Sequence, residues 1–251
     1  VNNNFDFKNL EKIEVKNISF SYTQNDNNIL ENATFELKRG KIYAITGKTG
    51  AGKSTLLDIL TGILVPSKGS ILINGKDIRE NIVKWQENVG YVPQDHFLLN
   101  ESIAQNISFG DDKLNFNRLR FSIENSELNE LLKQLPNKEN TIVGDRGILL
   151  SGGQKQRIFI ARELYRKPNL LILDEATSAL DSESEKSIQD SVDLLKGNIT
   201  VIIIAHRLST IKNVDRIFIM EKGKIIETGT YNELKNNDNS KFSNFAKLQI
   251  L

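Results

Sequence analysis

Short, almost wholly apolar runs alternate along the chain with longer segments whose apolar residues recur at helical spacing. The first pattern is typical of strands and the second of amphipathic helices. Strand-like runs occur at residues 13–22, 29–37, 41–46, 69–75, 90–93, 170–174, 200–205 and 216–227. We interpret the first three as a small antiparallel layer, 170–174 and 200–205 as buried parallel strands, and 216–227 as a hairpin.

The region from Asp95 to Lys167 has a mainly helical pattern, for example at residues 116–135 and again after Gln154. Pro168 marks the return to strands, and the charged, polar tail from Tyr231 is predicted to be helical. Parallel strands that alternate with helices predict an α/β fold with a largely parallel sheet.

The strand-like run 41–46 leads directly into a glycine-rich loop and then a helix-like segment. The loop reads Gly47-Lys48-Thr49-Gly50-Ala51-Gly52-Lys53-Ser54-Thr55. This unbroken G-x-x-x-x-G-K-S between a strand and a helix predicts a phosphate loop, whose N–H groups surround the phosphates of a nucleotide. We expect Lys53 to reach the terminal phosphates, Ser54 to ligate Mg²⁺ and Lys48 to point to solvent.

Two carboxylates follow the apolar run that begins at Leu170, namely Asp174 and Glu175. A buried parallel strand would deliver both to the carboxyl edge of the sheet, where ligands bind in open α/β folds. We expect Asp174 to hold Mg²⁺, directly or through water. Glu175 is then placed to act as the general base on the attacking water.

A second candidate anion site lies at Leu150-Ser151-Gly152-Gly153-Gln154, just before a predicted helix. A helix N-terminus offers N–H groups and the positive end of the helix dipole to an anion. One nucleotide does not need two such sites, so we expect Ser151, Gly153 and Gln154 to serve a nucleotide held by a partner copy.

In their order and spacing, these three motifs resemble the ATP-binding domain of an ABC transporter, over about residues 13–234. The resemblance implies a RecA-like P-loop NTPase core with a small antiparallel β subdomain and an inserted helical subdomain. Residues 1–251 would form one domain, divided into core and β subdomain (about 10–93 and 168–230), helical subdomain (about 94–167) and tail (231–251). Two such domains would close around two ATP molecules.

The resemblance also implies roles for residues outside these motifs. Tyr22 would stack on adenine, although it could equally be a core residue of the first strand. Gln94 would touch Mg²⁺ and water and act as the hinge of the helical subdomain; the alternative is a polar turn residue after Pro93. His206 would hydrogen-bond the γ-phosphate and orient the water. Asp181 would lie in a loop at the dimer interface, or cap the following helix.

Two segments are similar to those of exporters rather than importers, namely residues 141–147 with Asp145 where glutamate is usual, and 205–211. The sequence of residues 90–110 is similar to that of flippases of lipid-linked oligosaccharides. An exposed Phe97 or Leu98 would suit a groove that receives a loop of a membrane domain. We therefore expect an exporter or flippase ATPase.

Two other function classes fit the sequence less well than the exporter. A soluble ABC ATPase acting on chromosomes would need a long coiled coil, and one acting on ribosomes would carry two cassettes; neither is present in these 251 residues. A regulatory module without turnover would not need Lys53, Glu175 and His206.

Composition supports the same interpretation. The net charge of +1 gives no basic field for nucleic acid, and the lack of cysteine excludes thiol chemistry and fits a reducing compartment. No run approaches the ~18–20 apolar residues that span a bilayer. Since the chain begins with Val1, we expect a membrane domain fused ahead of it, a homo- or heterodimeric partner, and a place at the cytoplasmic face of the inner membrane.

Overall fold

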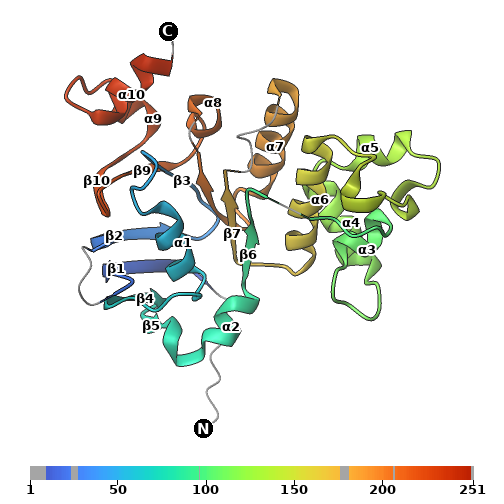
Figure 1. The fold of residues 1–251 in the computed structure, drawn as a ribbon, viewed down its shortest axis with the longest axis horizontal. Coiled ribbons are helices and arrows are strands. Elements are labelled where there is room, and N and C mark those ends of the chain that lie inside the picture. The colour runs from blue at the N-terminus through green and yellow to red at the C-terminus, as the bar shows by residue number, and fades with distance from the viewer. Residues whose placement is uncertain (1–9, 24–27, 96, 176–180, 206, 250–251) are drawn as a thin grey trace.

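The structure is a computed structural model that describes residues 10–23, 28–95, 97–175, 181–205 and 207–249 (Figure 1). Its strands are β1 (Lys12–Phe20), β2 (Leu30–Lys38), β3 (Ile42–Gly47), β4 (Lys68–Ile73), β5 (Lys76–Asp77), β6 (Val89–Val92), β7 (Leu170–Asp174), β8 (Thr200–Ile204), β9 (Arg216–Glu221) and β10 (Lys224–Gly229). Its α-helices are α1 (Lys53–Leu60), α2 (Ile82–Glu87), α3 (Ile103–Ile107), α4 (Phe116–Asn125), α5 (Asn129–Gln134), α6 (Gly152–Tyr165), α7 (Ser182–Leu195), α8 (Leu208–Ile211), α9 (Tyr231–Lys235) and α10 (Lys241–Gln249).

A six-stranded sheet in the order β10-β9-β3-β8-β7-β6 forms the centre of the molecule. All of its neighbouring strands are parallel except β9 and β10, which form the expected hairpin. Ile204 of β8 pairs with both Ile45 of β3 and Asp174 of β7. This register brings the carboxyl ends of β3, β7 and β8 to one edge of the sheet, an edge that the sequence predicted for β7 and β8.

Both faces of this sheet are covered, which explains why β7 and β8 are almost wholly apolar. On one face, Ile42 and Ala44 of β3 belong to a core shared with α6 and α7. On the other face, Tyr43 and Ile45 belong to a second core shared with α1 and the antiparallel sheet. Alternate residues of one strand thus face two different layers.

The antiparallel layer is a separate four-stranded sheet in the order β2-β1-β4-β5. The prediction that residues 41–46 belong to this layer is wrong, because β3 lies in the central sheet between β9 and β8. The strand at 69–75 takes its place, since β4 pairs antiparallel with β1. A run buried on both faces carries no alternation that would reveal its sheet.

Helices α3 to α6 lie between β6 and β7 in the sequence and are grouped together at one side of the molecule (Figure 1). The helical pattern at residues 116–135 forms two helices, α4 and α5, rather than one. The chain turns between them at Glu127, whose φ of 55° is left-handed. Such a φ is uncommon for a residue with a side chain, so the pattern of apolar positions did not predict the break.

The tail from Tyr231 is helical, as expected, and α10 is attached to β10. Glu227 of β10 accepts hydrogen bonds from the Ser240 hydroxyl at 2.6 Å and the Lys241 backbone N–H at 2.7 Å. Phe242 is fully buried beside them. In the part of the chain that the structure describes, no helix has the length and apolar composition that crossing a bilayer requires.

Candidate active site

The glycine-rich loop joins β3 to α1 at the carboxyl edge of the central sheet. Gly52, the N-cap of α1, has a φ of 97°, and a Cβ there would lie 2.9 Å from the Ile29 carbonyl oxygen. Only glycine combines this φ with so close an approach. The back of the loop is held by Gly223 of the β9–β10 turn, whose N–H donates to the Ala51 carbonyl oxygen at 3.0 Å.

Side chains in this loop divide into a buried set, which includes Lys53, and an exposed rim. Lys53 is buried, and its ammonium group donates hydrogen bonds to the Gly47 and Lys48 carbonyl oxygens. Lys48 itself is exposed, as predicted, and so are Thr49, Gly50 and Ser54. Ala51 and Thr55 are buried beneath them. The exposed rim and the N-terminus of α1 face solvent, where an anion can reach them.

Lys53 lies in the electrostatic field of the acidic strand end. Burial lowers the pKa of Lys53, and the negative charges of Glu175 and Asp174 oppose that effect. The structure therefore brings the predicted lysine and the two predicted carboxylates into one neighbourhood. A buried cation beside two carboxylates is an arrangement typical of functional sites.

Asp174 ends β7 and accepts a 2.8 Å hydrogen bond at Oδ2 from the hydroxyl group of Tyr91. Burial and this hydrogen bond raise the pKa of Tyr91, so the phenol remains a donor. Burial, and then the charge of Asp174, raise the pKa of Asp58 on α1. Neither Tyr91 nor Asp58 was expected at the site. The sequence contained part of the evidence for Tyr91, because Tyr91 and Asp174 both lie near the carboxyl ends of predicted strands.

Glu175 follows β7 in a left-handed conformation with a φ of 48°. Its backbone N–H donates to the Ile204 carbonyl oxygen at 3.2 Å, which ties the chain just after β7 to the end of the neighbouring parallel strand β8. A non-glycine residue in this region of φ/ψ space costs of order 1–3 kcal/mol, and such residues cluster at active sites.

The second predicted anion site is the N-terminus of α6. Ser151 is the N-cap, and its hydroxyl accepts the Gln154 N–H at 3.3 Å while the Gln154 side chain accepts the Ser151 N–H at 2.9 Å. Ser151 and Gly152 are exposed. Gly153 is buried against α7, where a Cβ would lie 2.5 Å from the Ser184 hydroxyl oxygen. Figure 1 shows α1 and α6 apart, with β6 and β7 between them.

Tyr22 and Gln94 are both exposed side chains outside regular elements. Tyr22 follows β1 and exposes 62% of its surface, while Phe20 at the end of the strand is buried. The alternative of Tyr22 as a core residue of the first strand is therefore wrong. Gln94 comes after the end of β6, close to the sheet edge that carries Asp174.

The remaining predicted residues divide between the described and the undescribed parts of the chain. Asp181 is the N-cap of α7, with its carboxylate accepting the Ser184 N–H at 3.2 Å. Phe97 is 51% exposed, whereas Leu98 is buried, so only Phe97 suits a contact with another protein. His206, His96 and residues 178–180 lie outside the described residues.

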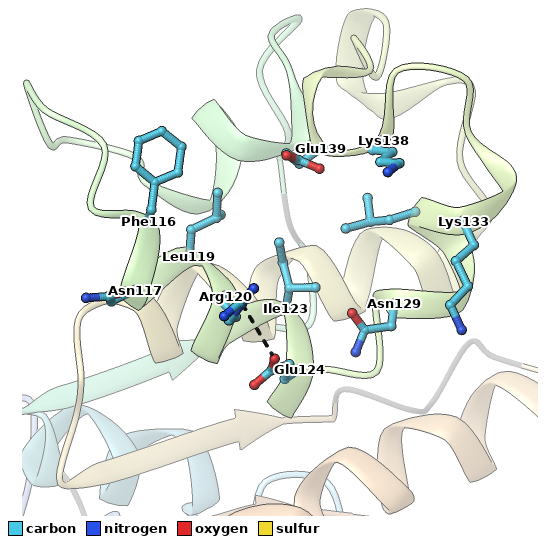
Figure 2. A pocket seen from close by; sticks show the side chains of 11 residues that line it. Phe116, Asn117, Leu119, Arg120, Ile123, Glu124, Asn129, Lys133, Lys138 and Glu139 are labelled. Atoms are coloured by element: carbon cyan, nitrogen blue, oxygen red, sulfur yellow. Dashed lines mark ion pairs between the residues drawn. The ribbon is translucent and has the colours of Figure 1, made fainter.

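A surface cavity of about 710 Å³ lies elsewhere, on the helical region. Figure 2 shows its lining, which comes from α4, α5 and the turn near Lys138, with an ion pair between Arg120 and Glu124. It contains none of the predicted site residues. The candidate site is therefore the sheet edge and not this cavity.

Comparison with known proteins agrees with this site. The family described as "ABC transporter" matches residues 30–178. Leukotoxin translocation ATP-binding proteins LktB of Mannheimia glucosida, Mannheimia haemolytica and Bibersteinia trehalosi are each 43% identical over 239 residues, which cover 95% of this chain and 34% of theirs. A bacterial Atm1-family ABC exporter with ATP bound shares 36% identity at a TM-score of 0.86, over 97% of this chain and 42% of that chain.

The matched region contains the phosphate loop, the N-terminus of α6 and the acidic end of β7. The chain spans about a third of the length of the curated relatives that it matches. Their names and that of the structural relative concern translocation and export. The chain belongs to the ABC transporter family, as an ATP-binding domain.

Proposed function

We propose that this chain powers an exporter by closing, with a second ATP-binding domain, around two ATP molecules. The observation that carries the proposal is that two candidate anion sites lie on separate elements, the phosphate loop before α1 and the N-terminus of α6. In Figure 1 these elements lie apart. One nucleotide on one chain does not use both, so the α6 site is left to a nucleotide on the partner.

The described residues fit ATP at the phosphate loop. The exposed rim of the loop presents N–H groups, and Lys53 supplies a positive charge for the terminal phosphates. Tyr22 is exposed, as a residue that stacks on adenine must be. The partner's copies of Ser151 and Gly153 would add donors to the γ-phosphate, where fixed donors stabilise the charge of the transition state.

The donor set also fits Mg²⁺. Ser54 offers a hydroxyl, Asp174 a carboxylate and Gln94 an amide oxygen, and Mg²⁺ prefers such oxygen ligands together with phosphate oxygens. When bound, the metal would neutralise the developing charge on the phosphates. Glu175, whose backbone is hydrogen-bonded to the end of β8 at the same edge, would accept the proton of the attacking water, with His206 orienting that water.

Coupling to a membrane domain would pass through the segment after β6. Gln94 begins this segment, and Phe97 exposes an aromatic side chain within it. Exposed aromatic residues are frequent anchors of protein interfaces. We propose that a transmembrane domain, fused or separate, contacts this surface, and that the chain therefore works at the cytoplasmic face of the membrane.

The dependence of ATPase activity on protein concentration tests this proposal. If each ATP site is shared by two copies, the specific activity must rise with concentration until the dimer is saturated. The Lys53→Ala variant, measured in parallel, gives the background to subtract. A specific activity that stays constant across the range, above that background, would mean that one copy hydrolyses ATP alone.

A further inference from the structure

Tyr91 contacts both Asp174, at the acidic end of β7, and α6, the helix whose N-terminus is the second candidate anion site. It lies on β6, where it pairs with Ile172 of β7. Asp174 lies two residues further along β7 and so on the same face of the sheet as Ile172. The long aromatic side chain spans this diagonal, and its hydroxyl group reaches Asp174 Oδ2 at 2.8 Å.

The backbone of the same residue contacts the helix that begins with the second anion site. The Tyr91 N–H lies 3.4 Å from Oε2 of Glu163, a buried residue of α6. Gly90 permits this approach, since a Cβ there would already lie 3.1 Å from the Glu163 Cβ. β6 is therefore packed tightly against α6 at the point where Tyr91 turns its side chain towards the site.

We propose that Tyr91 is a positioning residue that orients the Asp174 carboxylate for the metal ion of the nucleotide. The inference rests on the proposed role of Asp174 as a metal ligand. A hydrogen-bond donor that holds one carboxylate oxygen restricts rotation of the whole carboxyl group. Outer-shell partners of this kind are worth about 10–100-fold in metal affinity or activity.

Two physical effects of the hydroxyl group oppose each other. The hydrogen bond withdraws negative charge from the carboxylate, which by itself would weaken its hold on a cation. It also removes the entropy cost of ordering the carboxylate when the metal binds. In a partly buried strand end between packed layers, the orientation of the carboxylate should be the larger effect. The two effects predict opposite changes in the Tyr91→Phe variant, which makes the inference testable.

The test is the affinity of Mn²⁺, measured by electron paramagnetic resonance in the presence of ADP, for the Tyr91→Phe variant of the 251-residue chain. Tyr91→Phe keeps the ring and its packing and removes only the donor. We expect the Mn²⁺ dissociation constant to rise about 10–100-fold. The affinity for ADP measured in EDTA should stay within about twofold, since the hydrogen bond does not reach the phosphate loop.

Tyr165→Phe is the matched control. The Tyr165 hydroxyl accepts the Asn115 N–H at 2.8 Å, and the side chain is buried on the helical region. Its loss should lower the melting temperature without changing Mn²⁺ affinity. ATP hydrolysis by Tyr91→Phe should in turn recover at high Mg²⁺, because the variant loses metal affinity rather than a reacting group.

A third variant separates this inference from the proposed function. Asp174→Asn should weaken Mn²⁺ binding more than Tyr91→Phe does. Unchanged Mn²⁺ affinity in Asp174→Asn would overturn the metal role of Asp174 itself. Weakened binding in Asp174→Asn with unchanged or tighter binding in Tyr91→Phe would overturn the inference alone, and Tyr91 would then be a structural residue only.

Discussion

The ammonium group of Lys53 donates a 2.9 Å hydrogen bond to the carbonyl oxygen of Gly47, the first residue of its own loop. A second hydrogen bond, at 3.2 Å, reaches the Lys48 carbonyl oxygen. An ammonium group has three N–H donors, so the two loop carbonyls hold the lysine in place and leave one donor for the phosphates of a nucleotide. Because burial lowers the pKa of Lys53, replacing this cation also removes a desolvation cost from the folded protein.

Lys53→Ala should accordingly lose ATP affinity without losing stability. Removing one partner of a buried charge pair costs about 2–5 kcal/mol, so the dissociation constant should rise at least about 30-fold. The melting temperature without nucleotide should stay the same or rise. Lys48→Ala, in the same loop but exposed, is the control and should change ATP affinity less than about threefold. Equal losses in the two variants would contradict a special role for Lys53.

Glu175→Gln should bind ATP normally and hydrolyse it about 10²–10⁴-fold more slowly, the usual contribution of general acid–base catalysis. Glutamine keeps the size of the side chain and its hydrogen-bonding atoms but does not accept the proton of water. The measurement is the single-turnover rate at saturating ATP. Glu183→Gln, an exposed residue in the first turn of α7, should retain full activity. A Glu175→Gln rate within tenfold of the unmutated rate would exclude it as the general base.

Tyr22→Ala should weaken ATP binding by about 1–2 kcal/mol, while Tyr22→Trp should be nearly neutral, because either aromatic ring can stack on adenine. The side chain is 62% exposed, so neither change should lower the melting temperature without nucleotide. Phe20→Ala provides the opposite pattern. Phe20 is only 7% exposed, and its truncation should cost about 3–5 kcal/mol of stability. Unchanged ATP affinity in Tyr22→Ala would disprove stacking.

The sequence predicted those parts of the site that depend on local order. Lys53, Ser54 and Ser151 are placed by a strand-loop-helix junction or a helix start, and each lies where its motif indicated. Tyr91 was missed because its bond to Asp174 spans 83 residues of sequence. The neighbours of each residue indicate that it lies near a strand end, but not that β6 and β7 are adjacent in the sheet.

The same distinction applies to the fold. The existence of every described strand except the two-residue β5 followed from an apolar run. The sheet to which β3 belongs did not, because a run buried on both faces has no polar side. The break at Glu127 also escaped prediction. It depends on a left-handed backbone at Glu127, a residue with a side chain, rather than on a glycine or proline that would mark the break in the sequence.

Glu185 on α7 should make the stability of the protein pH-dependent. Its carboxylate accepts hydrogen bonds from Ser209 at 2.5 Å, Thr210 at 2.8 Å and Arg207 at 2.9 Å. Burial disfavours the charged carboxylate, but these bonds from Ser209, Arg207 and Thr210 outweigh it and lower the pKa of Glu185. The carboxylate thus holds α7 against the segment that begins at Arg207.

A pKa that is lowered in the folded state determines the direction in which stability changes with pH. The stabilisation is present above the ordinary glutamate pKa of about 4.3 and is lost as the pH falls through the lower folded-state value. Glu185→Gln should therefore lower the melting temperature at pH 7 by several degrees, for a loss of about 1–3 kcal/mol. The difference from the unmutated protein should shrink as the solution is acidified below pH ~4. A difference that is constant with pH would show that the charge of Glu185 is not responsible.

Mixing two inactive variants tests the shared ATP site most directly. Lys53→Ala damages the phosphate loop, and Ser151→Arg blocks the exposed N-terminus of α6, so each should be inactive alone. In a mixed dimer, one interface collects both defects and the other pairs an intact loop with an intact helix. The mixture should recover ATPase activity, well below the unmutated level. No recovery at all, with mixed dimers demonstrated by cross-linking, would mean that Ser151 acts on its own chain's nucleotide or on none.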